Sequence, residues 1–155
     1  MGTEPTACEQ SQSTSPPTSW TAAVMAMTAV EASVDLLART GIGALREKSV
    51  ALTEYLIRLW RTSLEPLGVT LGSPVDPDRR GGHVGLRHPD AYRIDRALNE
   101  RANVRCDFRA PDVIRLAPVA AYTRFVDVWD AMDRLRRLLE SGESLEMPGE
   151  LTRVT

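Results

Sequence analysis

Residues 83–118 read HVGLRHPDAYRIDRALNERANVRCDFRAPDVIRLAP, and this stretch decides the fold class. Apolar and polar side chains alternate near both of its ends, which is typical of half-buried strands. The middle opens with Pro89 and spaces its apolar residues at helical intervals. The elements predicted here are a strand over 83–87, a helix over 89–102, and two short strands over 103–108 and 112–116, joined by the turn Arg109-Ala110-Pro111.

Helical patterns flank this stretch on both sides. Apolar residues recur there at every third or fourth position, and Gly41, Gly43 and Gly142 are the predicted stops. The flanking elements are helices over 21–37, 44–63 and 124–140, a short strand over 69–72, and a loop over 73–80 that is rich in proline and aspartate. This order predicts an α+β fold, in which a small antiparallel or mixed sheet packs against helices and is preceded by a long N-terminal helix.

The two ends of the chain differ in composition from its middle. Residues 1–17 are mainly Thr, Ser, Pro, Gln and Glu, so burial cannot offset the entropy of ordering them, and we expect a mobile leader. Residues 18–141 form the expected domain, and residues 142–155 are predicted to be a frayed tail. The length of 155 residues allows one domain with a modest core.

Charge and composition exclude several classes of function. With 19 basic against 21 acidic residues, and with its arginines interleaved with acids, the chain lacks the basic patch of a nucleic-acid-binding protein. No apolar run approaches the roughly 20 residues of a membrane-spanning helix, and the first residues do not resemble a secretory signal. Cys8 and Cys106 are far apart and offer no disulfide framework, so we expect a cytoplasmic, reducing compartment.

Most of the other reactive side chains have an ordinary structural explanation. His83 and His88 fall on opposite faces of a strand, so no metal site is predicted. The pair Gly81-Gly82 lacks the spacing of a phosphate-binding loop and indicates a turn. Cys106 is interpreted as a small packing residue. Lys48, the only lysine, is interpreted as an exposed amine on the polar face of a helix.

Arg115 lies between Val113 and Ala117 on one face of its predicted strand. A planar guanidinium among apolar neighbours can bind a carboxylate through two parallel hydrogen bonds. The same pattern is at least as compatible with an internal ion pair to Asp107 or Asp112. The residues alone leave these alternatives open.

Three motifs resemble, in this order, the C-terminal part of bacterial kynureninases. They are RGGHVGLRHPDAY at residues 80–92, DFRAPDVIRLAP at 107–118 and YTRFVDVW at 122–129. The resemblance extends back through GALREKS at residues 43–49 to the double proline at 16–17. It therefore covers roughly residues 14–141.

The resemblance implies the small C-terminal domain of a fold-type I pyridoxal-phosphate enzyme, which belongs to the aminotransferase fold family. Kynureninases are homodimers that hydrolyse kynurenine to anthranilate and alanine in tryptophan degradation. In this family the arginine matched by Arg115 binds the α-carboxylate of the substrate, and the residues matched by Ser15 and Thr14 lie near the substrate ring. The implied partners are an amino acid, kynurenine or 3-hydroxykynurenine, and a large domain or homologous subunit that carries the cofactor.

The family's Schiff-base lysine and most of its cofactor-binding residues have no counterpart in this sequence. We therefore expect the chain alone neither to bind pyridoxal phosphate covalently nor to cleave kynurenine, and we assign it no catalytic residue. The favoured hypothesis is the substrate-side portion of a kynureninase-like enzyme, completed by a large domain that binds pyridoxal phosphate. The alternatives are a stand-alone, non-catalytic amino-acid-binding or regulatory module and, with less support, a cofactor-independent enzyme that uses His83, Asp107 and Tyr122.

Overall fold

The computed structural model describes residues 20–149 of the chain. The chain divides into two units, Met1–Leu36 and Leu37–Thr155, and each is described by itself. Ser15 and Thr14, like the rest of the predicted leader, lie outside the described residues. None of the described helices is long and apolar enough to cross a membrane.

Helix α1, Trp20–Thr40, is rich in alanine and carries exposed apolar side chains. It ends at Gly41, which adopts a positive φ of 82° that side chains other than glycine rarely tolerate. The predicted helix over 21–37 is confirmed, and Gly41 is its stop, whereas Gly43 lies inside the next helix. The exposed stripe consists of Val24, Met27, Val30, Val34 and Leu37.

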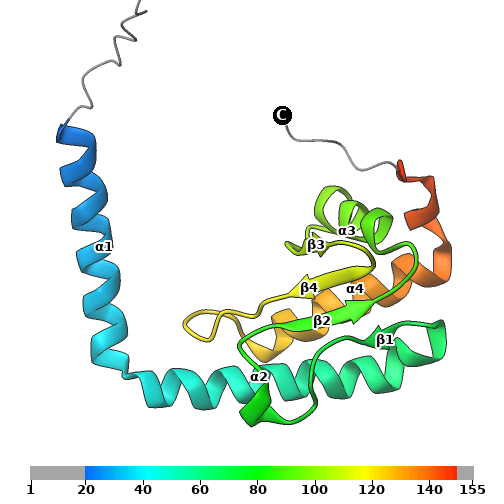
Figure 1. Ribbon diagram of the computed structural model, residues 1–155, viewed down its shortest axis with the longest axis horizontal. Helices are drawn as coiled ribbons and strands as arrows, with labels where there is room; N and C mark the ends of the chain where they lie inside the picture. Colours follow the sequence, from blue (N-terminus) through cyan, green and yellow to red (C-terminus); the bar gives the residue numbers. More distant parts are fainter. Residues whose placement is uncertain (1–19, 150–155) are drawn as a thin grey trace, which may run out of the picture. The chain divides into compact units, whose positions relative to one another are not determined.

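After the end of α1, the described residues of the second unit form three α-helices and a four-stranded sheet, whose arrangement can be followed in Figure 1. The helices are α2 (Ile42–Ser63), α3 (Ala91–Glu100) and α4 (Phe125–Ser141). The strands are β1 (Thr70–Leu71), β2 (Val84–Arg87), β3 (Asp107–Arg109) and β4 (Val113–Leu116). Short 3₁₀ turns η1 (Glu65–Leu67), η2 (Pro77–Arg79) and η3 (Glu143–Glu146) complete the unit.

The sheet is open and entirely antiparallel, with strand order β1-β2-β4-β3. The expected α+β class and the small sheet are therefore confirmed. The predicted strand over 103–108 is shorter and begins later, at Asp107, because Asn103 adopts a positive φ of 51° and turns the chain after α3.

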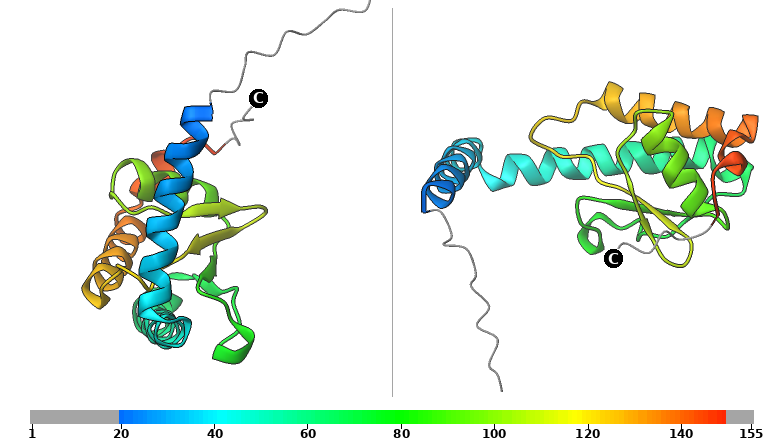
Figure 2. Two further views of the ribbon diagram at one scale, coloured as in Figure 1. Left: turned by 90° about the vertical axis from the view of Figure 1, so that its left-hand side faces the viewer. Right: turned by 90° about the horizontal axis from the view of Figure 1, so that it is seen from above.

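Helices α2, α3 and α4 all lie on one side of the sheet (Figures 1 and 2). Alternation along β4 explains this arrangement, because Ile114 and Leu116 are buried on the helix side while Arg115 between them is half-exposed. The indole of Trp60 donates a hydrogen bond of 2.9 Å to the carbonyl of Val69 and so ties α2 to the residue just before β1. Fully buried side chains of the core include Leu52, Leu64, Leu86, Ile94, Leu98 and Leu135.

The segment after α4 is more ordered than the sequence suggests. Gly142 ends the helix with a φ of 73°, after which η3 packs against α3. Ser144 is buried, Met147 is only 5% exposed, and Glu146 forms a 2.7 Å ion pair with Arg101. The described part of the predicted frayed tail is thus anchored, because one apolar side chain reaches the core.

Candidate functional site

The sheet face turned away from α2, α3 and α4 carries the charged side chains of the strands. No helix of the second unit covers this open sheet face among the described residues (Figure 2). Alternation places Asp107, Arg109, Arg115 and Arg87 on this face, because their neighbours along each strand are the inward-facing ones. An open face of this kind is accessible to a ligand or to another part of a larger protein.

Arg115 is paired with Asp107 across two adjacent strands. The two residues stand directly opposite each other in the antiparallel register of β3 and β4. Arg115 donates hydrogen bonds of 2.8 Å from Nε to Oδ1 and of 2.8 Å from Nη2 to Oδ2 of Asp107. The ion-pair alternative is therefore confirmed for Asp107, whereas Asp112 instead approaches Arg87 at 3.5 Å.

A second arginine joins this pair. The Nε atom of Arg109 lies 2.8 Å from Oδ2 of Asp107, so one carboxylate serves two guanidinium groups. Hydrogen bonding from Arg115 is the main cause that holds the pKa of Asp107 below its ordinary value; partial burial opposes this shift, and the charges of both arginines add to it. The cluster of Asp107, Arg109 and Arg115 keeps a net positive charge, since two cations face one anion.

Part of the Arg115 guanidinium is not engaged by Asp107. Among residues 20–149, Arg115 donates side-chain hydrogen bonds to Asp107 alone, through its Nε–Nη2 edge. The Nη1–Nη2 edge of the same planar group keeps unused N–H donors. The Arg115 side chain is 35% exposed, and the shape of this remaining edge suits a second carboxylate in the usual bidentate geometry.

Gly85 lies directly opposite Arg115 on the other neighbouring strand, β2. A Cβ atom at this position would stand 3.2 Å from Cγ1 of Val113 and 3.6 Å from Oγ of Ser73. The backbone N–H of Gly85 donates a 2.8 Å hydrogen bond to that same hydroxyl. Because Gly85 has no side chain, nothing projects from β2 directly beside Arg115. This role of Gly85 follows from the strand register and could not be read from the sequence.

The glycine pair lies in the irregular segment before β2, where Gly82 bends the chain, and the turn predicted there is not formed. A Cβ atom on Gly82 would lie 3.2 Å from Oγ of Ser49, so this segment approaches α2 closely. Arg80 is buried beside the pair and donates hydrogen bonds to the carbonyls of Pro74 and Val75. Arg80 thus holds the loop over 73–80 together, and Gly82 lets the segment after it approach α2.

His88 and Cys106 occupy structural positions. His83 is exposed, and Nδ1 of His88 accepts a 3.0 Å hydrogen bond from the backbone N–H of Asp90 at the start of α3. Cys106 donates a 3.2 Å hydrogen bond to Oδ1 of Asp95. Burial and this carboxylate raise the pKa of the Cys106 thiol far above its ordinary value, which makes it unreactive near neutral pH.

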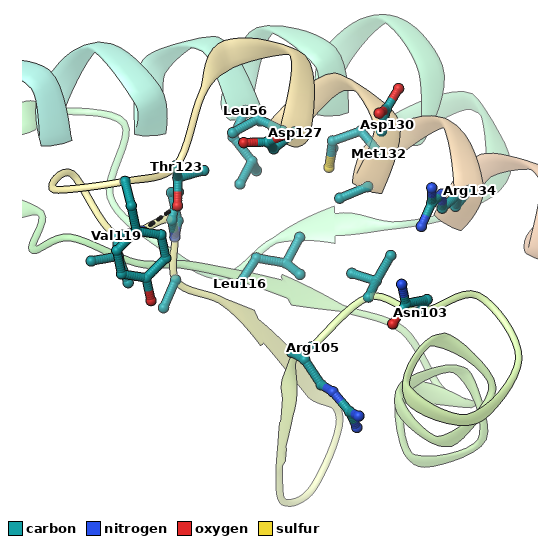
Figure 3. A pocket seen from close by; sticks show the side chains of 16 residues that line it. Leu56, Asn103, Arg105, Leu116, Val119, Thr123, Asp127, Asp130, Met132 and Arg134 are labelled. Atoms are coloured by element: carbon teal, nitrogen blue, oxygen red, sulfur yellow. Dashed lines mark hydrogen bonds between the residues drawn. The ribbon is translucent and has the colours of Figure 1, made fainter.

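A cavity of about 470 Å³ lies on the helix side of the sheet, between α2, α4 and the segment after β4 (Figure 3). Leu56, Leu116 and Met132 contribute apolar side chains to its lining. Arg115 is not among its lining residues, because successive residues of β4 face opposite sides of the sheet. Tyr122, one of the three groups considered for a cofactor-independent enzyme, also lines this cavity, whereas Asp107 lies on the open sheet face. Further lining residues include Asn103, Val119, Thr123, Asp127, Asp130 and Arg134.

The fold and the site together define a small α+β domain that presents an arginine–aspartate cluster on the open face of an antiparallel sheet. Residues 45–135 match the family model described as the kynureninase C-terminal domain. The chain therefore belongs to the kynureninase family and corresponds to its C-terminal part.

Individual relatives agree with this assignment. The chain is 36% identical over 118 residues to the kynureninase of Geobacillus thermodenitrificans. This alignment covers 76% of this chain and 27% of that protein. It is 39% identical over 111 residues to a kynureninase of Bacillus cereus, covering 72% of this chain and 26% of the relative. It is 41% identical over 108 residues to the kynureninase of Shouchella clausii, an alignment that covers 70% of this chain and 25% of the relative. The chain spans about a quarter of the length of these curated relatives.

Proposed function

We propose that this chain is the substrate-side portion of a kynureninase-like enzyme that hydrolyses L-kynurenine, or its 3-hydroxy analogue, to anthranilate and L-alanine in the cytoplasm. The observation that carries the proposal is the unused Nη1–Nη2 edge of Arg115 on the open sheet face. A positively charged cluster at this place suits the α-carboxylate of an amino acid. Membership of the kynureninase family supplies the substrate class.

In this proposal the chain binds and orients the substrate. Arg115 holds the α-carboxylate through a bidentate contact and so fixes the amino-acid end relative to the reacting carbons. Ser15 and Thr14 contribute near the aromatic ring, as the family resemblance implies. The exposed apolar stripe of α1 is a second surface of the chain that can pack against the rest of the enzyme or against a second subunit.

Pyridoxal phosphate supplies the electron sink for this chemistry in the complete enzyme. The described residues of this chain do not fit a covalent cofactor site. Lys48, the only lysine, is half-buried on α2 rather than exposed as predicted, and it is not among the lining residues of the cavity beside α4. A Schiff-base lysine needs a shielded pocket, so we propose that the cofactor is held by a large domain or a homologous subunit.

The first test is the intact mass of the native polypeptide in its source cells, with whatever co-purifies under mild conditions. A polypeptide several times larger than 17.1 kDa, or a 17.1 kDa chain bound to a partner with a cofactor-bearing lysine, supports the proposal. A 17.1 kDa chain that purifies without such a partner overturns the proposal and favours a non-catalytic amino-acid-binding or regulatory module.

Kinetics of the complete enzyme test the assigned residue. The variant Arg115→Ala should lower kcat/KM about 100-fold, because the substrate carboxylate loses its charged partner. The variant Arg58→Ala, which removes a guanidinium from the exposed face of α2, is the matched control and should leave kcat/KM unchanged. An unchanged kcat/KM for Arg115→Ala would remove this residue from the substrate site.

A further inference from the structure

We propose that Asp107 is the positioning residue of this site: its carboxylate holds the Nε–Nη2 edge of Arg115, and the Nη1–Nη2 edge is thereby presented to an amino-acid carboxylate. The ligand part of this inference rests on the proposed function. The positioning part rests on the geometry of the strand pair. Asp107 touches Arg115 and acts through it, so it has no catalytic role of its own.

Strand register makes this contact unusually well defined. Asp107 and Arg115 are direct cross-strand partners, and both of their hydrogen bonds are 2.8 Å long. An arginine side chain has many rotamers, and holding two N–H groups on a carboxylate that is fixed by its own strand removes most of that freedom. A ligand that binds the remaining edge therefore meets a guanidinium that is already oriented.

Arg109 explains why Asp107 can lie beside Arg115 without neutralising the positive charge that binds an anion. It contacts Oδ2 of Asp107 at 2.8 Å, so the anion is shared between two cations. One aspartate against two arginines leaves a net charge of about +1 on the cluster, and this charge attracts a further carboxylate. The pair of Arg87 and Asp112 on the same face is neutral and does not change this balance.

The geometry favours addition of the ligand over displacement of Asp107. Displacement would break two charge-assisted hydrogen bonds to gain two, and it would leave Asp107 with Arg109 alone. Addition keeps these bonds and uses N–H groups that Asp107 does not engage. The substrate carboxylate and Asp107 thus occupy different edges of one planar group.

Arginine-selective ¹⁵N NMR of the full chain tests the positioning directly. The Nε–H signal of Arg115, assigned by its loss in Arg115→Lys, should exchange slowly with water near neutral pH. Asp107→Asn should accelerate this exchange by about tenfold or more, because the uncharged amide cannot accept both bonds. Asp133→Asn is the matched control, since Asp133 also bridges two arginines, Arg136 and Arg137, but on α4.

A second variant protects the test against a folding failure. Arg109→Gln removes one partner of Asp107 but leaves the Arg115 pair intact, and a smaller acceleration is expected. Equal exchange rates of the Arg115 Nε–H in the unmodified chain, Asp107→Asn and Arg109→Gln would overturn the positioning role.

Titration with L-kynurenine tests the ligand part. The Nη signals of Arg115 should shift while its Nε–H stays protected, and the dissociation constant should rise about tenfold in Asp107→Asn. A loss of Nε–H protection on binding would show displacement of Asp107 and overturn the two-edge arrangement. No response at Arg115 would overturn the proposed function, whereas the ligand-free exchange rates would still decide the positioning role.

Discussion

Asp107→Asn should destabilise the domain near neutral pH, because the substitution removes the charge that two arginines share. Two charge-assisted hydrogen bonds in a buried site would contribute about 3–6 kcal/mol. The side chains of Asp107 and Arg115 are 41% and 35% exposed, so solvent screening reduces this figure towards the value of surface ion pairs. We expect a loss of about 1 kcal/mol in the free energy of unfolding.

The pH dependence of this loss follows from the direction of the pKa shift. The pKa of Asp107 is lower in the folded state than its ordinary value of 3.8. A lowered folded pKa gives stability that is fully present above the unfolded pKa and is lost as the pH falls through the folded pKa. The difference between the unmodified chain and Asp107→Asn should therefore be full near pH 7 and close progressively below about pH 4.

Urea denaturation followed by far-ultraviolet circular dichroism, at several pH values from about 7 down to about 2, measures the difference. The slope of the unfolding free energy against urea should stay the same in both proteins, so that only the midpoint moves. The reasoning is refuted by a difference that is equally large at the acid end, since steric damage would not depend on the charge of Asp107. It is also refuted by the absence of any difference near pH 7.

Three further perturbations test other parts of the structure. With the other cysteine replaced by serine, Cys106 should react with iodoacetamide near pH 8 at least about 100-fold more slowly than free cysteine, as mass spectrometry would show, because its thiol pKa is raised. Met147→Ala should lower the free energy of unfolding by about 2 kcal/mol in urea titrations, whereas Leu145→Ala, at a 56% exposed position, should change it by less than about 0.5 kcal/mol. Gly85→Val should cost about 1–2 kcal/mol, and adding Val113→Ala should recover part of this loss if the 3.2 Å approach to Val113 is its cause.

Much of the fold could be predicted from local patterns alone. Apolar spacing located α1, α2 and α4 within a few residues, because each helix buries or exposes one continuous stripe. Alternation around Arg115 correctly placed Ile114 and Leu116 in the core. The order of elements then restricted the class to α+β, since four short strands with three covering helices leave few other arrangements.

The anchored C-terminal segment could not be predicted in the same way. The residues after Gly142 are mostly polar, and a single Met147 in such a run carries no periodicity. Its burial depends on a surface of α3 that exists only in the folded domain. Local composition therefore favoured a frayed end, whereas tertiary packing determines the structure.

The partner of Arg115 could not be determined from the sequence because it depends on the exact register of the hairpin. The turn predicted over 109–111 would place Arg105 opposite Arg115, which would set two cations against each other. The observed register pairs Arg109 with Val113 instead, so that residues 110–112 form the turn and Asp107 meets Arg115. A shift of one residue at each end of the hairpin thus changes the charge beside the guanidinium from repulsive to attractive.

The same argument indicates why the cluster belongs to the hairpin itself. Asp107 and Arg109 are two residues apart on β3 and share the face of Arg115, so one hairpin supplies all three groups. The arginine that the family resemblance associates with substrate therefore has its orientation set by the strand directly beside it, and a change in the length of the turn over 110–112 should disturb the site more than most substitutions on the open sheet face.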